Sequence, residues 1–257
     1  MDAGLTGIEA VFIDLDGTLY LGQDLFPGVL DFLGRVEGRG IARFFLSNNS
    51  SQSKQDYVTR LSVMGIDADA DEILLSTDDL IAWLDRNEYA ATYLVGTESM
   101  RSMLEEQGID TESDDPDIVV LGYDTEIDYL KLSTAAVHLH RGVPLVASHP
   151  DVVCPSLDGG LPDVGAFLAL FEASTGVRPV HVCGKPDPGM IGHKIDELGL
   201  EPARVAIIGD RLYTDIEMAN RVGCVGVLVL SGEASRQDVD DATQSPDLIV
   251  DSVADLL

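Results

Sequence analysis

Four short segments of the sequence carry side chains that could do chemistry together, and each comes directly after an apolar run. They are DLDGT at 14–18, SN at 47–48, GKP at 184–186 and GDRLYTD at 209–215. Each alone is typical of a turn or a helix cap, but together they offer carboxylates, one lysine, and hydroxyl and amide donors. Clustered carboxylates repel one another unless a hard cation such as Mg²⁺ lies between them. A lysine and neutral donors beside that cation would complete a site for a dianionic phosphate.

The elements that must position these side chains alternate between two kinds. Six continuously apolar runs are typical of buried strands, and the longer segments between them show helical periodicity. The expected strands are 10–13, 42–46, 118–121, 145–147, 205–208 and 225–229. The expected helices are 28–39, 54–64, 78–86, 99–106, 129–140, 165–174, 188–198 and 214–222. This alternation predicts an α/β fold with a Rossmann-like, doubly wound parallel sheet, in which ligands bind at the carboxyl ends of the strands.

The composition is strongly acidic, with 45 Asp and Glu against 16 Lys and Arg and a formal net charge of -29. Such a chain lacks the basic footprint that binding to nucleic acid requires. No apolar run approaches the roughly 20 residues that span a bilayer, and no signal peptide is evident, so we expect a cytoplasmic protein without membrane contact. The acidity fits an ordinary acidic protein or adaptation to a salty, halophilic cytoplasm, and we favour the second interpretation. The three cysteines lack CxxC spacing, which argues against a disulfide or zinc scaffold.

In order along the chain, the four segments resemble the four motifs of the haloacid dehalogenase (HAD) superfamily of phosphohydrolases, between residue 10 and about residue 230. The resemblance implies that Asp14 attacks phosphorus as the nucleophile and forms an aspartyl-phosphate. It also implies that Asp16 is the general acid that protonates the leaving alkoxide and then the base that activates water. A carboxylate attacks a dianion only when a metal and cationic groups offset the repulsion.

Two sets of binding residues follow from the same resemblance. Mg²⁺ would be held by Asp14, the main-chain carbonyl of Asp16, and Asp210, with Asp215 in support. The phosphoryl oxygens would be bound by Ser47, Asn48 and Lys185. These roles describe catalysis by positioning and charge stabilisation of an in-line transfer.

The spacing of the motifs predicts where a second domain is inserted. The stretch between the first two motifs holds only a hairpin and one helix, whereas the stretch between the second and third is far longer than a crossover needs. We therefore expect a catalytic core of residues 1–78 and 181–257 and an α/β cap domain of residues 79–180. The cap carries strand–helix alternation of its own.

Two patterns within this cap, GYD at 122–124 and GVPLVASHPD at 142–151, resemble the NagD-like p-nitrophenylphosphatase subfamily. That subfamily usually has Asn where this chain has His149. We expect His149 and Asp151, on the loop after strand 145–147, to contact the substrate.

The expected function is that of a Mg²⁺-dependent phosphomonoesterase acting on small soluble phosphate esters, with a homodimer as one possible assembly. A phosphomutase would normally place its cap between the first two motifs, where there is no room, and a dehalogenase would normally lack Asp16. The alternative from another class is a phospho-accepting signalling domain without turnover. That module is about half as long and needs no insertion.

Overall fold

The computed structural model describes residues 5–154 and 159–256, which form two compact units. The first unit comprises Met1–Ser47, Tyr57–Leu74 and Ile191–Leu257, and the second comprises Asn48–Asp56 and Leu75–Met190. The segment 79–180 lies within the second unit, and so does Lys185. Among the described residues, no helix combines the length and the apolar character that crossing a bilayer requires.

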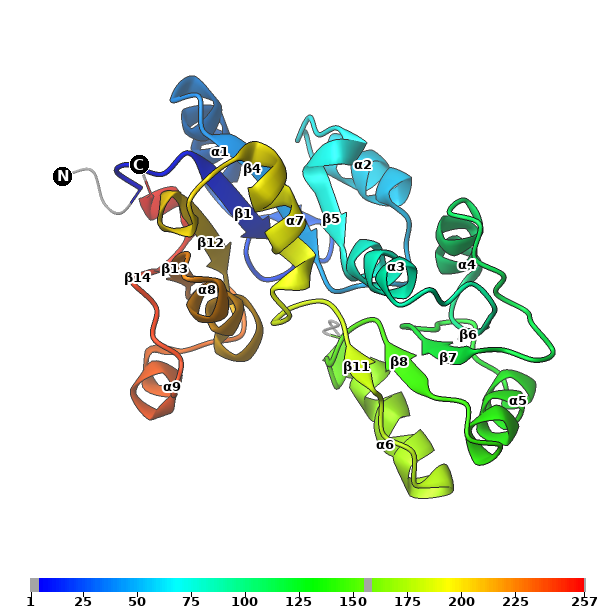
Figure 1. Ribbon diagram of the computed structural model, residues 1–257. Coiled ribbons are helices and arrows are strands. Elements are labelled where there is room, and N and C mark those ends of the chain that lie inside the picture. The colour runs from blue at the N-terminus through cyan, green and yellow to red at the C-terminus, as the bar shows by residue number, and fades with distance from the viewer. Residues whose placement is uncertain (1–4, 155–158, 257) are drawn as a thin grey trace. The chain divides into compact units, whose positions relative to one another are not determined.

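A six-stranded sheet in the order β14-β13-β12-β1-β4-β5 forms the centre of the first unit (Figure 1). Its strands are β1 (Ala10–Asp14), β4 (Ala42–Ser47), β5 (Ile73–Leu75), β12 (Val205–Gly209), β13 (Val225–Val229) and β14 (Leu248–Val250). β1 pairs in parallel with both β4 and β12, and β13 pairs in parallel with β12 and β14. These strands are mostly apolar because helices cover both faces of the sheet. The predicted α/β class with a parallel core sheet is confirmed.

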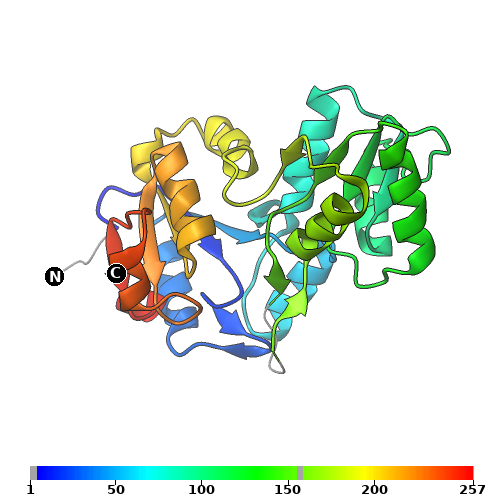
Figure 2. The same cartoon turned by 90° about the horizontal axis from the view of Figure 1, so that it is seen from below.

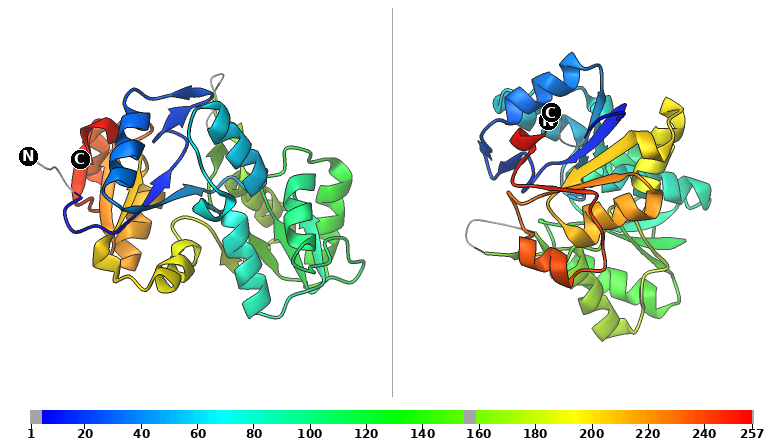
Figure 3. Two further views of the ribbon diagram at one scale, coloured as in Figure 1. Left: turned by 90° about the horizontal axis from the view of Figure 1, so that it is seen from above. Right: turned by 90° about the vertical axis from the view of Figure 1, so that its left-hand side faces the viewer.

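The chain leaves β1 in one direction across this sheet and β12 in the other. β1 is followed outward by β4 and β5, whereas β12 is followed outward by β13 and β14. Ligands of open α/β sheets bind beyond the strand ends where the order reverses, which here is between β1 and β12. The helices of this part of the chain are α1 (Val29–Gly38), α2 (Lys54–Val63), α7 (Gly189–Leu198), α8 (Glu217–Val222) and α9 (Arg236–Asp241). α1 lies on one face of the sheet, and α7 and α8 lie on the other (Figures 2 and 3).

The second unit contains a parallel four-stranded sheet in the order β11-β8-β7-β6. Its main elements are α3 (Ser76–Arg86), β6 (Thr92–Val95), α4 (Glu98–Glu105), β7 (Ile118–Leu121), α5 (Tyr129–His140), β8 (Leu145–Ala147), α6 (Val164–Thr175) and β11 (His181–Val182). Alternate residues of β7 point to opposite faces of this sheet. Ile118 and Val120 pack with α3 and α4, whereas Val119 and Leu121 pack with α5 and α6. Both faces are therefore buried within the unit.

The described residues also contain two short antiparallel strand pairs. They pair β2 (Tyr20–Leu21) with β3 (Asp24–Leu25), and β9 (Val153–Cys154) with β10 (Leu161–Pro162).

The structure differs from the sequence prediction at several element boundaries. The helix predicted at 78–86 begins at Ser76, because the Asp78 carboxylate accepts a hydrogen bond of 2.8 Å from Leu75 N and so caps an earlier turn. The helix predicted at 214–222 is divided into a π-helical turn, Leu212–Ile216, and the short α8. The short strands β5 and β14 were not predicted. β5 is three residues long and runs directly into α3, so no turn residues mark its end.

Candidate active site

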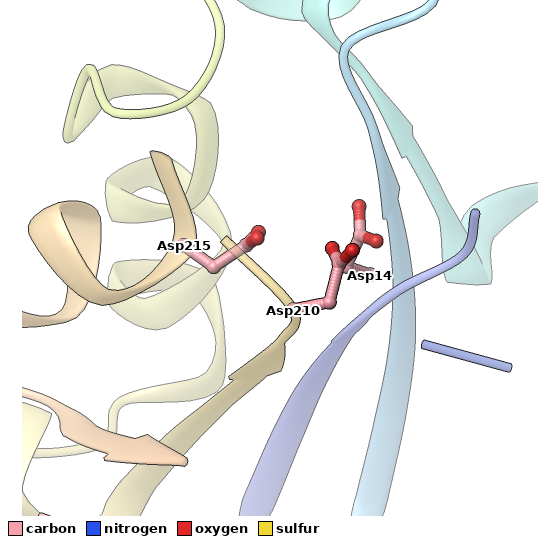
Figure 4. Close-up of side chains that lie close together, drawn as sticks. All are labelled: Asp14, Asp210 and Asp215. Carbon is pink, nitrogen blue, oxygen red and sulfur yellow. The ribbon is translucent and has the colours of Figure 1, made fainter. Parts of the chain in front are cut away.

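Three buried aspartates gather at the point where the strand order reverses (Figure 4). Asp14 is the last residue of β1, Asp210 directly follows β12, and Asp215 lies in the π-helical turn that comes next. The pairing of β1 with β12 places Ile13 opposite Ile208, so Asp14 and Asp210 leave neighbouring strands at the same edge of the sheet. One carboxylate oxygen from each aspartate lies within 4.8 Å of the others.

This donor set fits a hard divalent cation. Three carboxylates buried together repel one another, and a cation between them removes that repulsion. Mg²⁺ prefers oxygen ligands and usually keeps several waters, so it needs direct contact with only one or two of the three. Asp14 and Asp210 would hold the ion, and Asp215 would support the site from one turn further along the chain.

Glycines line this cluster because a side chain would not fit there. A Cβ atom on Gly17 would lie 2.3 Å from Asp210 Oδ2, and one on Gly232 would lie 2.0 Å from the same oxygen. A Cβ atom on Gly209 would lie 2.2 Å from Asp215 Cγ. Gly17 also has a φ of +87°, which L side chains rarely adopt. The carboxylates of Asp210 and Asp215 therefore occupy space that is available only because the three glycines have no side chains.

Hydrogen bonds fix the orientation of two of the carboxylates. The Thr18 hydroxyl donates to Asp14 Oδ2 over 3.2 Å, and Glu233 N donates to Asp210 Oδ2 over 2.7 Å. Each bond restricts rotation of its carboxylate, so the oxygens are held in place before any ligand arrives.

Asp16 lies outside this cluster, in more polar surroundings. Its side chain is 39% exposed, its Oδ2 accepts a hydrogen bond of 3.4 Å from the Tyr20 hydroxyl, and its Oδ1 is 3.7 Å from Arg60 Nη2. The Arg60 guanidinium also lies 4.6 Å from the centre of the Tyr20 ring. Asp16 is thus oriented by a hydroxyl and a cation and stays accessible to solvent.

Ser47, at the end of β4, contacts a buried tyrosine. Its Oγ lies 2.9 Å from the Tyr57 hydroxyl oxygen. Burial, and then the charge of Asp16, raise the pKa of Tyr57, so this hydroxyl stays neutral and able to donate. The Tyr57 hydroxyl therefore helps to orient the Ser47 hydroxyl.

The remaining predicted residues lie together in the second unit, around Asn48. Asn48 Oδ1 accepts from Lys185 N over 2.7 Å, and its Nδ2 donates to Lys185 O and to Asp151 Oδ1, each over 3.0 Å. Lys185 and Asp151 are both buried. The structure thus joins three of the predicted site residues, from positions 48, 151 and 185, through one amide side chain.

His149 is fully buried beside two carboxylates. Its Nε2 lies 3.5 Å from Asp163 Oδ1 and its Nδ1 lies 4.0 Å from Asp151 Oδ2. The imidazole therefore packs against the Asp151 carboxylate.

Comparisons with known proteins agree with this architecture. A haloacid dehalogenase-like hydrolase family model matches residues 11–110, and a HAD-hydrolase-like model matches residues 182–256. The acid sugar phosphatase of Staphylococcus epidermidis is 33% identical over 242 residues, which cover 93% of this chain and 92% of that protein. The chain belongs to the haloacid dehalogenase-like hydrolases.

Solved structures place this HAD-like hydrolase with the NagD-like phosphatases. The 4-nitrophenylphosphatase of Thermotoga maritima is 37% identical, covers 97% of this chain and 96% of its own, and has a TM-score of 0.93. NagD from E. coli K-12 is 29% identical, covers 97% and 98% of the two chains, and has a TM-score of 0.89. The glycerol phosphate phosphatase of Mycobacterium tuberculosis in complex with magnesium is 29% identical, covers 96% and 75%, and has a TM-score of 0.89. The predicted subfamily is confirmed.

Sequence reasoning did not find the residues that orient this HAD-like site. Tyr57 and Arg60 lie three residues apart on a predicted helix, which places them on one face, and this spacing could have indicated a shared role. No such signal exists for Asp79, whose partner Gly184 lies 105 residues further along the chain.

Proposed function

We propose that this NagD-like phosphatase hydrolyses small soluble phosphate esters, with Mg²⁺ as its cofactor and Asp14 as its nucleophile. The observation that carries the proposal is the buried cluster of Asp14, Asp210 and Asp215 at the reversal point of a HAD-type sheet. The relatives support it, because their names describe phosphatases of sugar, nitrophenyl and glycerol phosphates, and one was solved with magnesium.

In the proposed reaction, an oxygen of Asp14 bonds to phosphorus while the bond to the leaving alkoxide breaks. Bound Mg²⁺ would offset the repulsion between the carboxylate and the dianionic phosphate. Thr18 holds Asp14 Oδ2, which fixes the rotation of the nucleophile. Because approach and alignment are prepared in advance, part of the entropic barrier is removed before the reaction begins.

Asp16 gives its proton to the leaving alkoxide and then takes one from the water that attacks the phosphorylated Asp14. The water oxygen bonds to phosphorus while the bond to Asp14 breaks, which releases inorganic phosphate, restores the Asp14 carboxylate and leaves Asp16 protonated again. Exposure of the Asp16 side chain lets it equilibrate with solvent protons between turnovers. The Tyr20 hydroxyl and Arg60 hold its two oxygens, so the acid keeps one orientation.

From the resemblance of the motifs to those of the family, we assign binding of the phosphoryl oxygens to Ser47, Asn48 and Lys185. We assign the choice of substrate to the inserted residues 79–180, acting as a cap, with Asp151 as its contact; His149, predicted as a second contact, is fully buried and would act only through Asp151. The hydrogen bond from Asn48 to Asp151 supports this assignment, because it joins a predicted phosphate ligand to a predicted cap residue. The net charge of -29 supports a small substrate over nucleic acid. A cytoplasmic location and a homodimer remain predictions.

Replacing Asp14 by asparagine tests the proposal. Asp14→Asn removes the nucleophile with almost no change of shape, so p-nitrophenyl phosphate hydrolysis should fall by several orders of magnitude while circular dichroism stays that of the wild type. EDTA should inactivate the wild-type enzyme and Mg²⁺ should restore it. Near-wild-type turnover by Asp14→Asn would refute the covalent route. Release of no more than one equivalent of nitrophenolate by the wild type would favour the phospho-accepting domain.

A further inference from the structure

Asp79 is a buried carboxylate to which no motif assigns a role. It lies in the first turn of α3 and is 4% exposed. Its Oδ2 accepts a hydrogen bond of 2.9 Å from the main-chain N–H of Gly184, the residue that precedes Lys185. α3 is therefore tied to the lysine segment 184–186 through a side chain that solvent does not reach.

The lysine segment is held by two consecutive main-chain amides. Asp79 binds the N–H of Gly184, and Asn48 binds the N–H of Lys185 over 2.7 Å. The N–H of Gly184 belongs to the peptide plane before that residue and the N–H of Lys185 to the plane after it, so the two partners hold both planes. The second plane leads into Lys185 and limits the direction in which its side chain leaves the backbone.

The helix α3 supplies the first of these supports and holds the residue that supplies the second. Ser76 Oγ donates to Asn48 O over 2.6 Å, and Asp79, three residues later on the same face of α3, accepts from Gly184 N. Gly184 has a φ of +70°, and a Cβ atom on it would lie 2.8 Å from Ser76 Cβ and from Asn48 Oδ1. The segment therefore packs against α3 too closely for any side chain at position 184.

Burial of the Asp79 carboxylate is costly and brings few other contacts. Desolvation raises the pKa of Asp79 to about 6, and the charge of Asp187 adds to the rise, whereas the bond from Gly184 lowers it. Its second oxygen, Oδ1, has no hydrogen-bond partner among the described residues. A buried carboxylate with an unsatisfied oxygen contributes little to the stability of the fold. The hydrogen bond that it accepts from Gly184 is therefore its main contribution. A carboxylate also offers an acceptor in either orientation, which an amide does not.

We propose that Asp79 is a positioning residue for Lys185, which orients the lysine segment so that the ammonium group binds the phosphoryl oxygens. This inference rests on the proposed function, in which Lys185 is a phosphate ligand. Asp79 itself touches neither the substrate nor the metal.

Competitive inhibition by inorganic phosphate is the direct test, because it measures phosphoryl binding without the chemical step. Asp79→Ala removes the acceptor and should raise both Ki for phosphate and KM for p-nitrophenyl phosphate about tenfold, the worth of one well-formed hydrogen bond. Its kcat should change less. Asp79→Asn keeps an acceptor of the same shape and should stay within about threefold of the wild type.

A matched control separates this effect from loss of helix charge. Asp85→Ala makes the same substitution at an exposed position of α3 and should leave Ki unchanged. If Asp79→Ala folds poorly, Asp79→Val provides a second variant without the acceptor, because its apolar side chain suits a buried position. The higher Ki is expected there too.

Lys185→Ala distinguishes failure of the inference from failure of the proposed function. If Lys185→Ala raises Ki while Asp79→Ala and Asp79→Val do not, the positioning role is wrong and the proposed function stands. If Lys185→Ala leaves Ki unchanged, its role as a phosphate ligand is wrong and the positioning role falls with it. If Asp79→Asn binds phosphate as weakly as Asp79→Ala, the acceptor is not what matters, and the inference is overturned.

Discussion

Replacing Gly232 by alanine should weaken magnesium binding by displacing a single carboxylate. The new Cβ atom would lie 2.0 Å from Asp210 Oδ2 and 2.7 Å from Gly17 O, whereas Cβ atoms in proteins essentially never approach within 3.0 Å. Gly232 is not among the residues with positive φ, so the substitution itself causes no backbone strain. The side-chain oxygen moves more easily than the backbone oxygen, so Asp210 should shift by about 1 Å.

That displacement is large on the scale of a metal site. Mg²⁺ demands ligand distances of about 2.0–2.1 Å, and a competent site tolerates deviations of about 0.2 Å. Loss of a residue that only supports a ligand already costs about 10- to 100-fold in metal affinity. A displaced ligand should cost at least the upper value, so the dissociation constant for Mg²⁺ (the magnesium constant) should rise about 100-fold. This rise corresponds to a loss of about 2.7 kcal/mol in binding free energy.

The assay is hydrolysis of p-nitrophenyl phosphate over a magnesium titration, with calorimetric titration of Mg²⁺ as a direct measure of binding. Gly34→Ala is the matched control, because it adds the same methyl group on α1 with no atom within 4 Å. Its magnesium constant should equal that of the wild type. If Gly232→Ala also had the wild-type constant, Asp210 would not be a magnesium ligand, and the assignment of the buried cluster would be wrong.

Three further predictions concern the acid, a buried charge and the surface. Asp16→Asn should lose several orders of magnitude with alkyl phosphates and much less with p-nitrophenyl phosphate, whose leaving group needs little protonation; equal losses would contradict the role of Asp16 as the acid. Burial raises the pKa of Asp79 from 3.8 to about 6, so the native state binds this proton more tightly than the unfolded chain, and stability is lost as the pH rises through that window. Asp79→Asn lacks this titration, so its free energy of unfolding minus that of the wild type should rise by about 3 kcal/mol from about pH 4 to about pH 8. Urea unfolding followed by Trp83 fluorescence measures this difference, and a difference independent of pH would contradict the prediction. With a net charge of -29, the melting temperature should keep rising with KCl into the molar range, and a flat profile would indicate ordinary acidity without adaptation to salt.

Local features of the chain were predicted from the sequence because their causes are local. Continuous apolar runs predicted β7, β8 and β13 with their observed bounds, since a strand covered on both faces is apolar at every position. The motif at 14–18 and the pair Asp210 and Asp215 were recognised because each set lies within a few residues at the end of a strand. Neighbours of this kind are close in any fold that the chain adopts, and reading them needs no knowledge of the sheet order.

Contacts between distant parts of the chain were decided only by the tertiary structure. The pairing of β1 with β12 brings Asp14 beside Asp210, and no residue of either strand specifies the other as its partner. The hydrogen bond from Gly184 to Asp79, and the burial of His149 against Asp151, likewise appear only once α3 and the sheet of the second unit are packed. A polar residue near a helix start has the same sequence pattern whether it caps that helix, as Asp78 does, or supports a segment more than a hundred residues away, as Asp79 does. The difference depends on which groups packing leaves beyond the reach of water, because a buried N–H must find an acceptor wherever the fold provides one.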